Sequence, residues 1–323
     1  MRPLLAVAAA LLLALAAPAR AQQYPTAKPI RLIVPFPAGG SADNVTRIVA
    51  RGLSDGLGQQ VIVENKPGGD GIIAASALLQ SVPDGYTLLM GTATGMNAVP
   101  VMRKTPPYDP VADFTPISRV GNFVHLLVVH NDVPAQTLQE FIAYARANPG
   151  KLNYATTNFT AQAGTLQLMK AAGIDMVHVP YKGSAQSIPD LISGRVQVSF
   201  DSSPAIYMPH VKAGKLRILA TMMEHRSPLA PEAPTLPEAG IQPVQTQPWG
   251  GLFGPARLPK PIAERLSREV VQVLQQAETR KRLDDHGFEP ESSTPGEFGA
   301  FVKTQLETWR RVAKEGGMSL ESP

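Results

Sequence analysis

The sequence of 323 residues contains no cysteine, only 6% aromatic residues and little net charge. Without cysteine there is no disulfide, no thiol catalysis and no lipid-modified N-terminal cysteine. The low aromatic content argues against an aromatic-rich binding surface. The formal charge is only +4, and no run of five like charges occurs. We therefore expect neither a nucleic-acid partner nor a basic membrane-surface patch.

Signatures of common enzymes are also missing. The chain has no Gly-x-Ser-x-Gly elbow, Walker loop or His-Glu-x-x-His motif. The six histidines are scattered without metal-ligand spacing. Gly69-x-Gly71-x-x-Ala74 resembles a dinucleotide fingerprint, but the next predicted strand ends at Thr92 without an acidic residue for a ribose. We predict no enzymatic activity, no cofactor and no metal; a cleft hydrolase stays an alternative, because catalytic triads are geometric.

The N-terminus has the pattern of an export signal. Arg2 precedes an apolar run at residues 4–17, which is short for a membrane span, and Ala19-Arg20-Ala21 follows. This pattern predicts a cleaved signal peptide at residues 1–21, a mature chain that starts near Gln22, and a periplasmic location. Removing Arg2 and Arg20 lowers the net charge from +4 to +2. A retained membrane anchor is the alternative interpretation.

Short apolar runs alternate with helical patterns along most of the chain. This rhythm is typical of α/β domains built on parallel strands. Strands are predicted at residues 30–36, 61–64, 87–90, 126–129, 152–155, 177–181, 196–200, 216–221 and 249–253. Helices are predicted from Ser41 to about Gly56, around residues 72–79, from the Thr137/Glu140 capping box onward, and at 163–172, 185–192 and 204–213.

The C-terminal part of the chain suggests a discontinuous domain. Residues 227–261 are proline-rich, as expected of connections that cross a surface. Two amphipathic helices follow at 262–276 and at 295 to about 314, without strands of their own. They need a sheet to cover. We predict that residues 22–122 and 249–323 form one lobe and residues 123–248 the other.

A glycine-containing turn after the first strand is the leading candidate for an anion site. Ligands of open α/β sheets bind at the carboxyl ends of strands, and the N–H groups that begin a helix favour negative charge. Glycine allows close approach to the backbone. The alternative is a tight turn with Ser41 as N-cap, and Asp43 suits the helix dipole without a ligand. The candidate residues are Phe36, Pro37, Ala38, Gly39, Gly40, Ser41 and Asp43.

Polar side chains follow two later strands. Hydroxyl and amide groups after residues 152–155 suit a neutral wall around a polar solute, or alternatively cap the next helix. After residues 196–200, Asp201 either takes a ligand's donor group or orders its loop. Lys182 is more simply a solvated surface charge. The segment after residues 152–155 comprises Thr156, Thr157, Asn158, Phe159 and Thr160.

Several motifs together resemble the Bug-type receptors, the periplasmic solute-binding proteins of tripartite tricarboxylate transporters. Each motif is modest alone, but their order covers essentially the whole mature chain. They are Pro29-Ile30-Arg31-Leu32-Ile33-Val34-Pro35-Phe36-Pro37-Ala38-Gly39-Gly40-Ser41-Ala42-Asp43, Val63-Glu64-Asn65-Lys66-Pro67-Gly68-Gly69, Pro83-Asp84-Gly85-Tyr86-Thr87-Leu88-Leu89, Tyr108-Asp109-Pro110, Asp113-Phe114-Thr115-Pro116, Val179-Pro180-Tyr181-Lys182-Gly183 and Ala213-Gly214-Lys215-Leu216-Arg217.

The resemblance implies a two-domain Venus-flytrap fold that captures a small carboxylate solute for membrane transporter subunits. It implies that the Phe36–Asp43 turn and the Thr156–Thr160 loop hold the ligand from opposite sides through backbone groups, hydroxyls and water. It adds further cleft-lining positions, and we expect the protein to act as a monomer. These further positions are Thr92, Ala93, Thr94, Asp201 and Ser202.

Two segments depart from the family pattern. Many members have a glycine-containing loop where this chain has Thr157 to Thr160, and residues 95–98 replace a segment expected to be more polar. Phe159 and Met96 would make the cleft more apolar. Dicarboxylates, tricarboxylates, acidic amino acids, nicotinate-like compounds and aromatic acids therefore remain candidate solutes. A sensor that presents the same solute to a signalling partner is the runner-up function.

Overall fold

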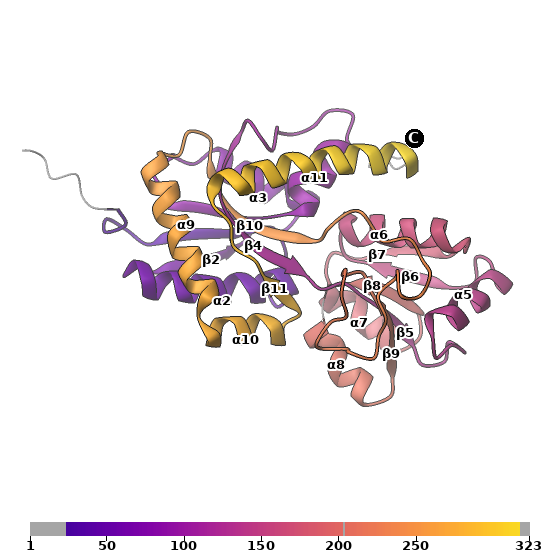
Figure 1. The fold of residues 1–323 in the computed structure, drawn as a ribbon. Coiled ribbons are helices and arrows are strands. Elements are labelled where there is room, and N and C mark those ends of the chain that lie inside the picture. The colour runs from indigo at the N-terminus through magenta and orange to yellow at the C-terminus, as the bar shows by residue number, and fades with distance from the viewer. Residues whose placement is uncertain (1–23, 203, 317–323) are drawn as a thin grey trace, which may run out of the picture.

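The computed structural model describes residues 24–202 and 204–316, which form two α/β lobes side by side (Figure 1). A six-stranded sheet with its helices makes the first lobe, and a five-stranded sheet with its helices makes the second. The two-lobed α/β fold predicted from the sequence is thereby confirmed. The predicted signal peptide lies outside the described residues.

The sheet of the first lobe has the order β11-β4-β10-β3-β1-β2. Its core strands β1, β2 and β3 are parallel, while β10 and β11 pair antiparallel with their neighbours. The strands are β1 (Ile30–Val34), β2 (Val61–Asn65), β3 (Thr87–Thr92), β4 (Phe114–Phe123), β10 (Trp249–Pro255) and β11 (Phe288–Pro290). The helices of this lobe are α2 (Ser41–Leu57), η1 (Gly69–Gly71), α3 (Ile72–Leu79), η2 (Thr94–Ala98), α4 (Val99–Met102), α9 (Lys260–Gln275), α10 (Ala277–Asp285) and α11 (Pro295–Gly316).

The sheet of the second lobe has the order β7-β6-β8-β5-β9. Strands β7, β6 and β8 are parallel, and β5 is antiparallel to β8 and β9. The strands are β5 (Leu126–His130), β6 (Asn153–Thr156), β7 (Val177–Pro180), β8 (Val198–Asp201) and β9 (Leu216–Thr221). The helices are α5 (Leu138–Ala147), α6 (Phe159–Ala172), α7 (Ser184–Ile192) and α8 (Pro204–Lys212).

Each sheet is apolar on both faces because helices cover both. Successive side chains of a strand point to opposite faces. In β1, Leu32 packs into the core under α2 and α9, whereas Ile33 packs into the core under α3 and α11. In β5, Leu127 and Leu126 are divided between two cores in the same way. The continuous apolar runs of the sequence therefore correspond to strands buried on both sides.

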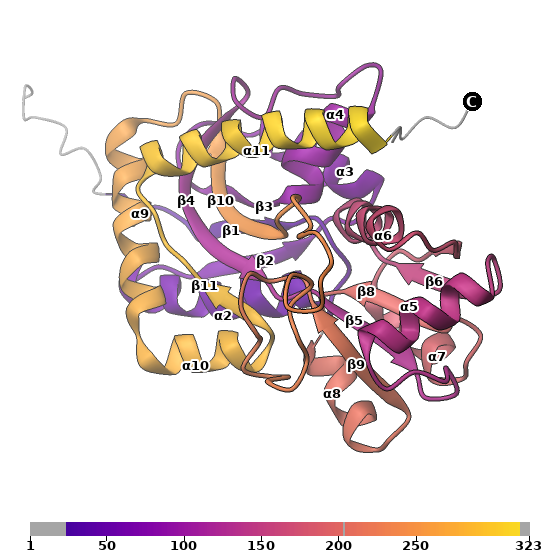
Figure 2. The same cartoon turned by 45° about the vertical axis from the view of Figure 1, so that its right-hand side comes forward.

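The chain passes between the lobes twice, and the two passages lie together. The first crossing, residues 123–125, joins β4 to β5, and the second, residues 246–248, leads into β10. The N–H of Phe123 donates to the carbonyl of Pro248 (2.7 Å), so the crossings are directly hydrogen-bonded. Figure 2 shows the long connection from β9 to β10 running back over the second lobe.

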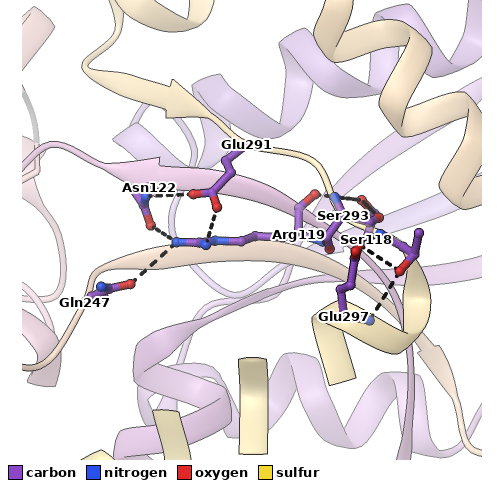
Figure 3. A network of polar contacts seen from close by, with 8 residues as sticks. Ser118, Arg119, Asn122, Gln247, Glu291, Ser293 and Glu297 are labelled. Carbon is purple, nitrogen blue, oxygen red and sulfur yellow. Dashed lines mark hydrogen bonds and ion pairs between the residues drawn. The ribbon is translucent and has the colours of Figure 1, made fainter. Parts of the chain in front are cut away.

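A polar network supports the crossings from the first lobe (Figure 3). The guanidinium of Arg119 donates to Glu291 Oε1 and to Asn122 Oδ1, each at 2.7 Å, and lies 4.1 Å from the centroid of the Phe301 ring. A longer contact of 3.5 Å reaches Gln247 Oε1. This buried arginine joins β4, the segment after β11 and the second crossing.

The sequence-based assignments need three corrections in the first lobe. Strand β4 was not predicted, because Pro116, Ser118 and Gly121 interrupt its apolar pattern. The C-terminal helices do have a strand between them: β11 pairs with β4 after the unpredicted helix α10. Helices α9 and α10 contact α2, and α11 contacts β4.

Within residues 24–202 and 204–316, no helix has both the length and the apolarity needed to cross a bilayer.

Candidate ligand-binding cleft

A cavity lies where the two lobes meet at the crossings. Both lobes contribute to it, and both crossings form part of its wall. The residues that line it are Phe36, Pro37, Ala38, Gly40, Ser41, Ala42, Thr92, Ala93, Thr94, Phe123, His125, Thr157, Asn158, Thr160, Gly183, Ser184, Ala185, Asp201, Ser202, Pro248 and Trp249.

The first lobe contributes the N-terminus of α2. Its N-cap is Gly40, with φ −78° and ψ 170°, and a glycine brings no side-chain acceptor for the first amides of the helix. The N–H of Asn44 donates to the Gly40 carbonyl (3.0 Å), so the amides of Ser41 and Ala42 precede the first helical bond. These amides, together with the helix dipole, favour an anion at this point of the cavity.

Asp43 shapes this turn from behind instead of lining the cavity. Its carboxylate accepts from the Gly39 N–H (2.9 Å), Arg47 Nε (3.0 Å) and Asn65 Nδ2 (2.8 Å). Burial raises the pKa of Asp43, but the hydrogen bonds from Arg47, Gly39 and Asn65 outweigh it and lower the pKa. Asp43 therefore stays ionised and fixes the loop, and Gly39 adopts φ +80° within it. The half-exposed Arg47 is ion-paired with Asp43 rather than simply solvated.

The second lobe contributes the N-terminus of α7, which the sequence analysis did not select. Gly183 is the N-cap and brings no side-chain acceptor, and the N–H of Gln186 donates to its carbonyl (3.0 Å). A Cβ at Gly183 would lie 3.7 Å from Pro37 Cγ, so the α2 and α7 turns face each other. The Gly183-Ser184 pair repeats Gly40-Ser41 at another strand-to-helix turn. This repeated dipeptide could have identified the α7 turn from the sequence.

Asp201 organises the side of the cavity at the end of β8. Its Oδ2 accepts from the hydroxyls of Thr157 and Ser184, each at 2.9 Å, and its Oδ1 accepts from the Ser202 N–H (2.7 Å). These donors all come from the second lobe. Of the two roles considered for Asp201, ordering its loop is the one these contacts support.

The start of α6 links the two lobes. The Thr94 hydroxyl lies 2.9 Å from the Thr160 hydroxyl and 3.4 Å from Asn158 Oδ1, which also accepts from the Ala161 N–H (2.9 Å). Asn158 is thus the N-cap of α6, as the alternative interpretation of this loop proposed. The hydroxyl contacts across the cleft hold the α6 turn against η2.

Several polar atoms at the cavity have unused hydrogen-bonding capacity. Ser41 Oγ, Thr92 Oγ1 and both ring nitrogens of His125 are buried and find no hydrogen-bond partner among the described residues. Leaving a buried polar group unsatisfied costs about 1–3 kcal/mol. A polar ligand in the cavity would supply the missing partners.

Most of the predicted site residues line the cavity, but four do not. Gly39 and Asp43 build the turn behind it. The Thr156 hydroxyl lies 2.6 Å from His178 Nε2, and Phe159 packs against hydrophobic cores. Met96 is likewise buried in a core, so the expectation that Phe159 and Met96 make the cleft apolar was wrong. Of the aromatic side chains of the wall, Phe36 was among the predicted site residues. Phe123 and Trp249 lie at the crossings, and sequence spacing gave no signal for them.

Comparisons with known proteins agree with this geometry. The family model "Tripartite tricarboxylate transporter family receptor" matches residues 45–318. Protein BugT of Bordetella pertussis is 35% identical over 95% of this chain and 94% of its own length. An R. palustris protein solved with adipate has a TM-score of 0.86 at 32% identity, over 92% of this chain and 99% of that one. MatC from Rhodopseudomonas palustris with bound malate has a TM-score of 0.80 at 29% identity, over 88% and 98%.

These matches span both lobes and the cleft, as the motif-based resemblance predicted. Receptors of this kind bind a solute without transforming it, in keeping with a cleft built from helix N-termini and hydroxyls. The chain therefore belongs to the receptor family of the tripartite tricarboxylate transporters and is a periplasmic-type solute-binding protein, not an enzyme.

Proposed function

We propose that this receptor captures a small dicarboxylate in the cleft and delivers it to the membrane subunits of a tripartite tricarboxylate-type transporter. The observation that carries the proposal is the pair of helix N-termini, α2 and α7, that face the cavity from opposite lobes with glycine N-caps. Two such sites suit a ligand with an acid group at each end.

The first carboxylate is proposed to bind at the start of α2. The Ser41 hydroxyl and the amides that follow Gly40 are the donors, because Ser41 Oγ is buried and unpartnered among the described residues. Hydrogen bonds to a charged group contribute about 1.5–3 kcal/mol each. No lysine or arginine occurs among the cavity-lining residues of the described chain, so an arginine clamp has no candidate here.

The second acid group is proposed to lie toward α7, with the connecting carbons against Phe123, Pro248 and Trp249. These apolar side chains suit a hydrocarbon spacer more than a third carboxylate. A ligand that bridges the lobes binds the closed arrangement best and shifts the population toward it. The relatives solved with adipate and malate support the same class of solute.

The remaining proposals concern the whole chain. Residues 1–21 are proposed to direct export and to be removed near Ala21, so that the receptor acts in the periplasm. The moving units are proposed to be residues 22–122 with 249–323, and residues 123–248, in a monomer. Intact-mass analysis of periplasmic material tests the cleavage site.

The binding site is tested by calorimetric titration of adipate, malate, citrate and benzoate into the wild type and Gly40→Val. Gly40 has negative φ, and a Cβ there would make an ordinary contact of 3.5 Å with the Pro37 carbonyl oxygen. The backbone therefore tolerates a side chain at this position, and the methyl groups of valine are expected to cover the amides. We expect Gly40→Val to weaken dicarboxylate binding tenfold or more, the effect of one lost charge-assisted hydrogen bond.

Gly296→Val is the matched control. Gly296 also lies in the first turn of a helix, α11, and has open space around it, but it does not line the cavity. This variant should bind like the wild type. Equal binding by both valine variants, or tightest binding of benzoate, would contradict the proposed dicarboxylate site.

A further inference from the structure

His125 is a cavity residue for which the proposed function so far has no role. It ends the first crossing, is 1% exposed and lines the cavity. Its carbonyl accepts from the Met222 N–H (3.1 Å), and its ring centroid lies 6.5 Å from that of Phe200. Backbone pairing and the neighbouring ring thus hold the imidazole at the cavity.

Both nitrogens of this ring are buried and have no hydrogen-bond partner within the described part of the chain. A neutral imidazole has one N–H donor and one nitrogen acceptor, and a protonated one has two donors. A structural histidine of the interior would have its nitrogens satisfied by neighbouring groups. The unused nitrogens at a cavity wall therefore point to a partner that arrives with the solute.

Among the described cavity-lining residues, no lysine or arginine balances the negative charge near His125. Of the cavity-lining residues described, His125 and Asp201 are the titratable ones besides hydroxyls, and Asp201 is satisfied by neutral donors alone. Behind Asp201, on α8, the buried Tyr207 hydroxyl lies 3.0 Å from Ser199 Oγ. Burial raises the pKa of Tyr207, so this neighbour is neutral. Phe123 and Pro248 of the crossings and the adjoining Trp249 carry no charge.

In the free protein the imidazole is neutral. Burial lowers the pKa of His125 to about 4, although the charge of Asp201 acts in the opposite direction. A bound dicarboxylate adds negative charge beside this ring while excluding water. Added negative charge favours the protonated form of a histidine.

We propose that solute capture is coupled to the uptake of one proton by His125, whose imidazolium then donates hydrogen bonds to the bound acid. The proton comes from the solvent, so the net event is neutral imidazole plus proton plus carboxylate giving a buried ion pair. This inference rests on the proposed function, because it needs an anionic solute in this cleft. It makes His125 the cationic partner that the cleft otherwise lacks among its described residues.

The coupling fixes the sign of the pH dependence. A proton bound in the complex but not in the free protein makes affinity fall as pH rises. Between the lowered pKa of His125 in the free protein and its raised pKa in the complex, the affinity falls up to about tenfold for each pH unit. A receptor that binds the fully ionised acid without proton uptake would show no fall in affinity over pH 6 to 8.

The experiment is titration calorimetry at pH 7 in buffers of different ionisation enthalpy, with the tightest binder among adipate, malate and citrate. The wild type and His125→Gln are compared, because glutamine keeps a donor and an acceptor but does not titrate. We expect the wild type to take up about one proton and the variant none, and the pH dependence of Kd to disappear in the variant.

The outcomes separate the two proposals. Equal proton uptake in both proteins would overturn the role of His125 and leave the receptor function intact. Binding of none of the acids would overturn the proposed dicarboxylate site, and this inference with it. If His125→Gln does not fold, histidine ring chemical shifts of the wild type decide: an imidazolium at residue 125 in the complex at pH 7 supports the proposal, and a neutral ring overturns it.

Discussion

Two strand-to-helix turns face the same cavity but use their N–H groups differently. At α6, Asn158 is the N-cap, and its side chain accepts from the Ala161 amide, so the turn satisfies itself. At α2, the N-cap is Gly40, which brings no such acceptor. The first turn has a side-chain cap, whereas the second leaves its first amides without one. Under the proposed function, the turn that receives the acid is the one without a side-chain cap, and not the one richest in hydroxyls.

Gly40→Asp removes the difference between the two turns, because it gives α2 a side-chain cap of its own. The new carboxylate would accept from the first amides of the helix and repel an incoming acid. We expect affinity for the dicarboxylate to fall at least about 100-fold, from two lost charge-assisted hydrogen bonds and the added like charge. Unfolding stability should rise by only a few tenths of a kcal/mol, because glycine is already a fair N-cap.

Calorimetric titration and urea unfolding measure the two effects. Gly40→Asn is the control that caps without charge, and it should lie between the wild type and Gly40→Asp in affinity. Undiminished binding by Gly40→Asp would mean that the acid binds elsewhere in the cleft.

Ser41→Ala tests the α2 turn by removing one proposed ligand donor without adding a cap. The Ser41 hydroxyl is buried and, within the described residues, has no partner, so removing it takes away an unsatisfied group from the free protein. Stability should be unchanged or higher, while affinity should fall about tenfold. Parallel urea unfolding with and without adipate separates these signs. A loss of stability in the free protein would show that this hydroxyl has a structural partner.

Asn158→Ala is the reciprocal change at the turn that caps itself. Loss of an N-cap side chain costs about 0.5–2 kcal/mol, so the free energy of unfolding should fall by roughly 1 kcal/mol. The same measurement on Thr137→Ala, at the N-cap of α5 far along the second lobe, gives the size of a purely structural cap. If Asn158→Ala leaves stability unchanged, α6 does not depend on its cap.

The sequence predicted the scaffold well where the pattern was local. The nearly continuous apolar run at Ile30–Val34 followed by Gly39-Gly40 located both a buried strand and the turn that faces the cavity. The Thr137/Glu140 capping box also predicted the start of α5, with the Thr137 hydroxyl accepting from the Glu140 N–H. Such features depend on residues within one turn or one strand.

What the sequence did not predict depends on residues brought together from a distance. Phe123, His125 and Trp249 reach the cavity because two crossings more than 100 positions apart lie side by side. Strand β4 lacks alternation, since Pro116 and Gly121 fall where its pairing with β10 is irregular. Phe159 and Met96 were assigned to the cleft because they stand in segments that the family resemblance places there, but apolar side chains near a cleft are equally suited to the cores behind it.

The hydrogen bond between Phe123 and Pro248 has a mechanical consequence. Two separate tethers would allow the lobes to swing, twist and slide in several independent ways. The backbone hydrogen bond joins the two crossings into one paired connection, and Arg119 attaches that connection to the first lobe. We expect this pairing to reduce the relative movement of the proposed lobes toward a single degree of freedom. Filling the cleft would then set one angle between the lobes, which the proposed membrane partner would sense.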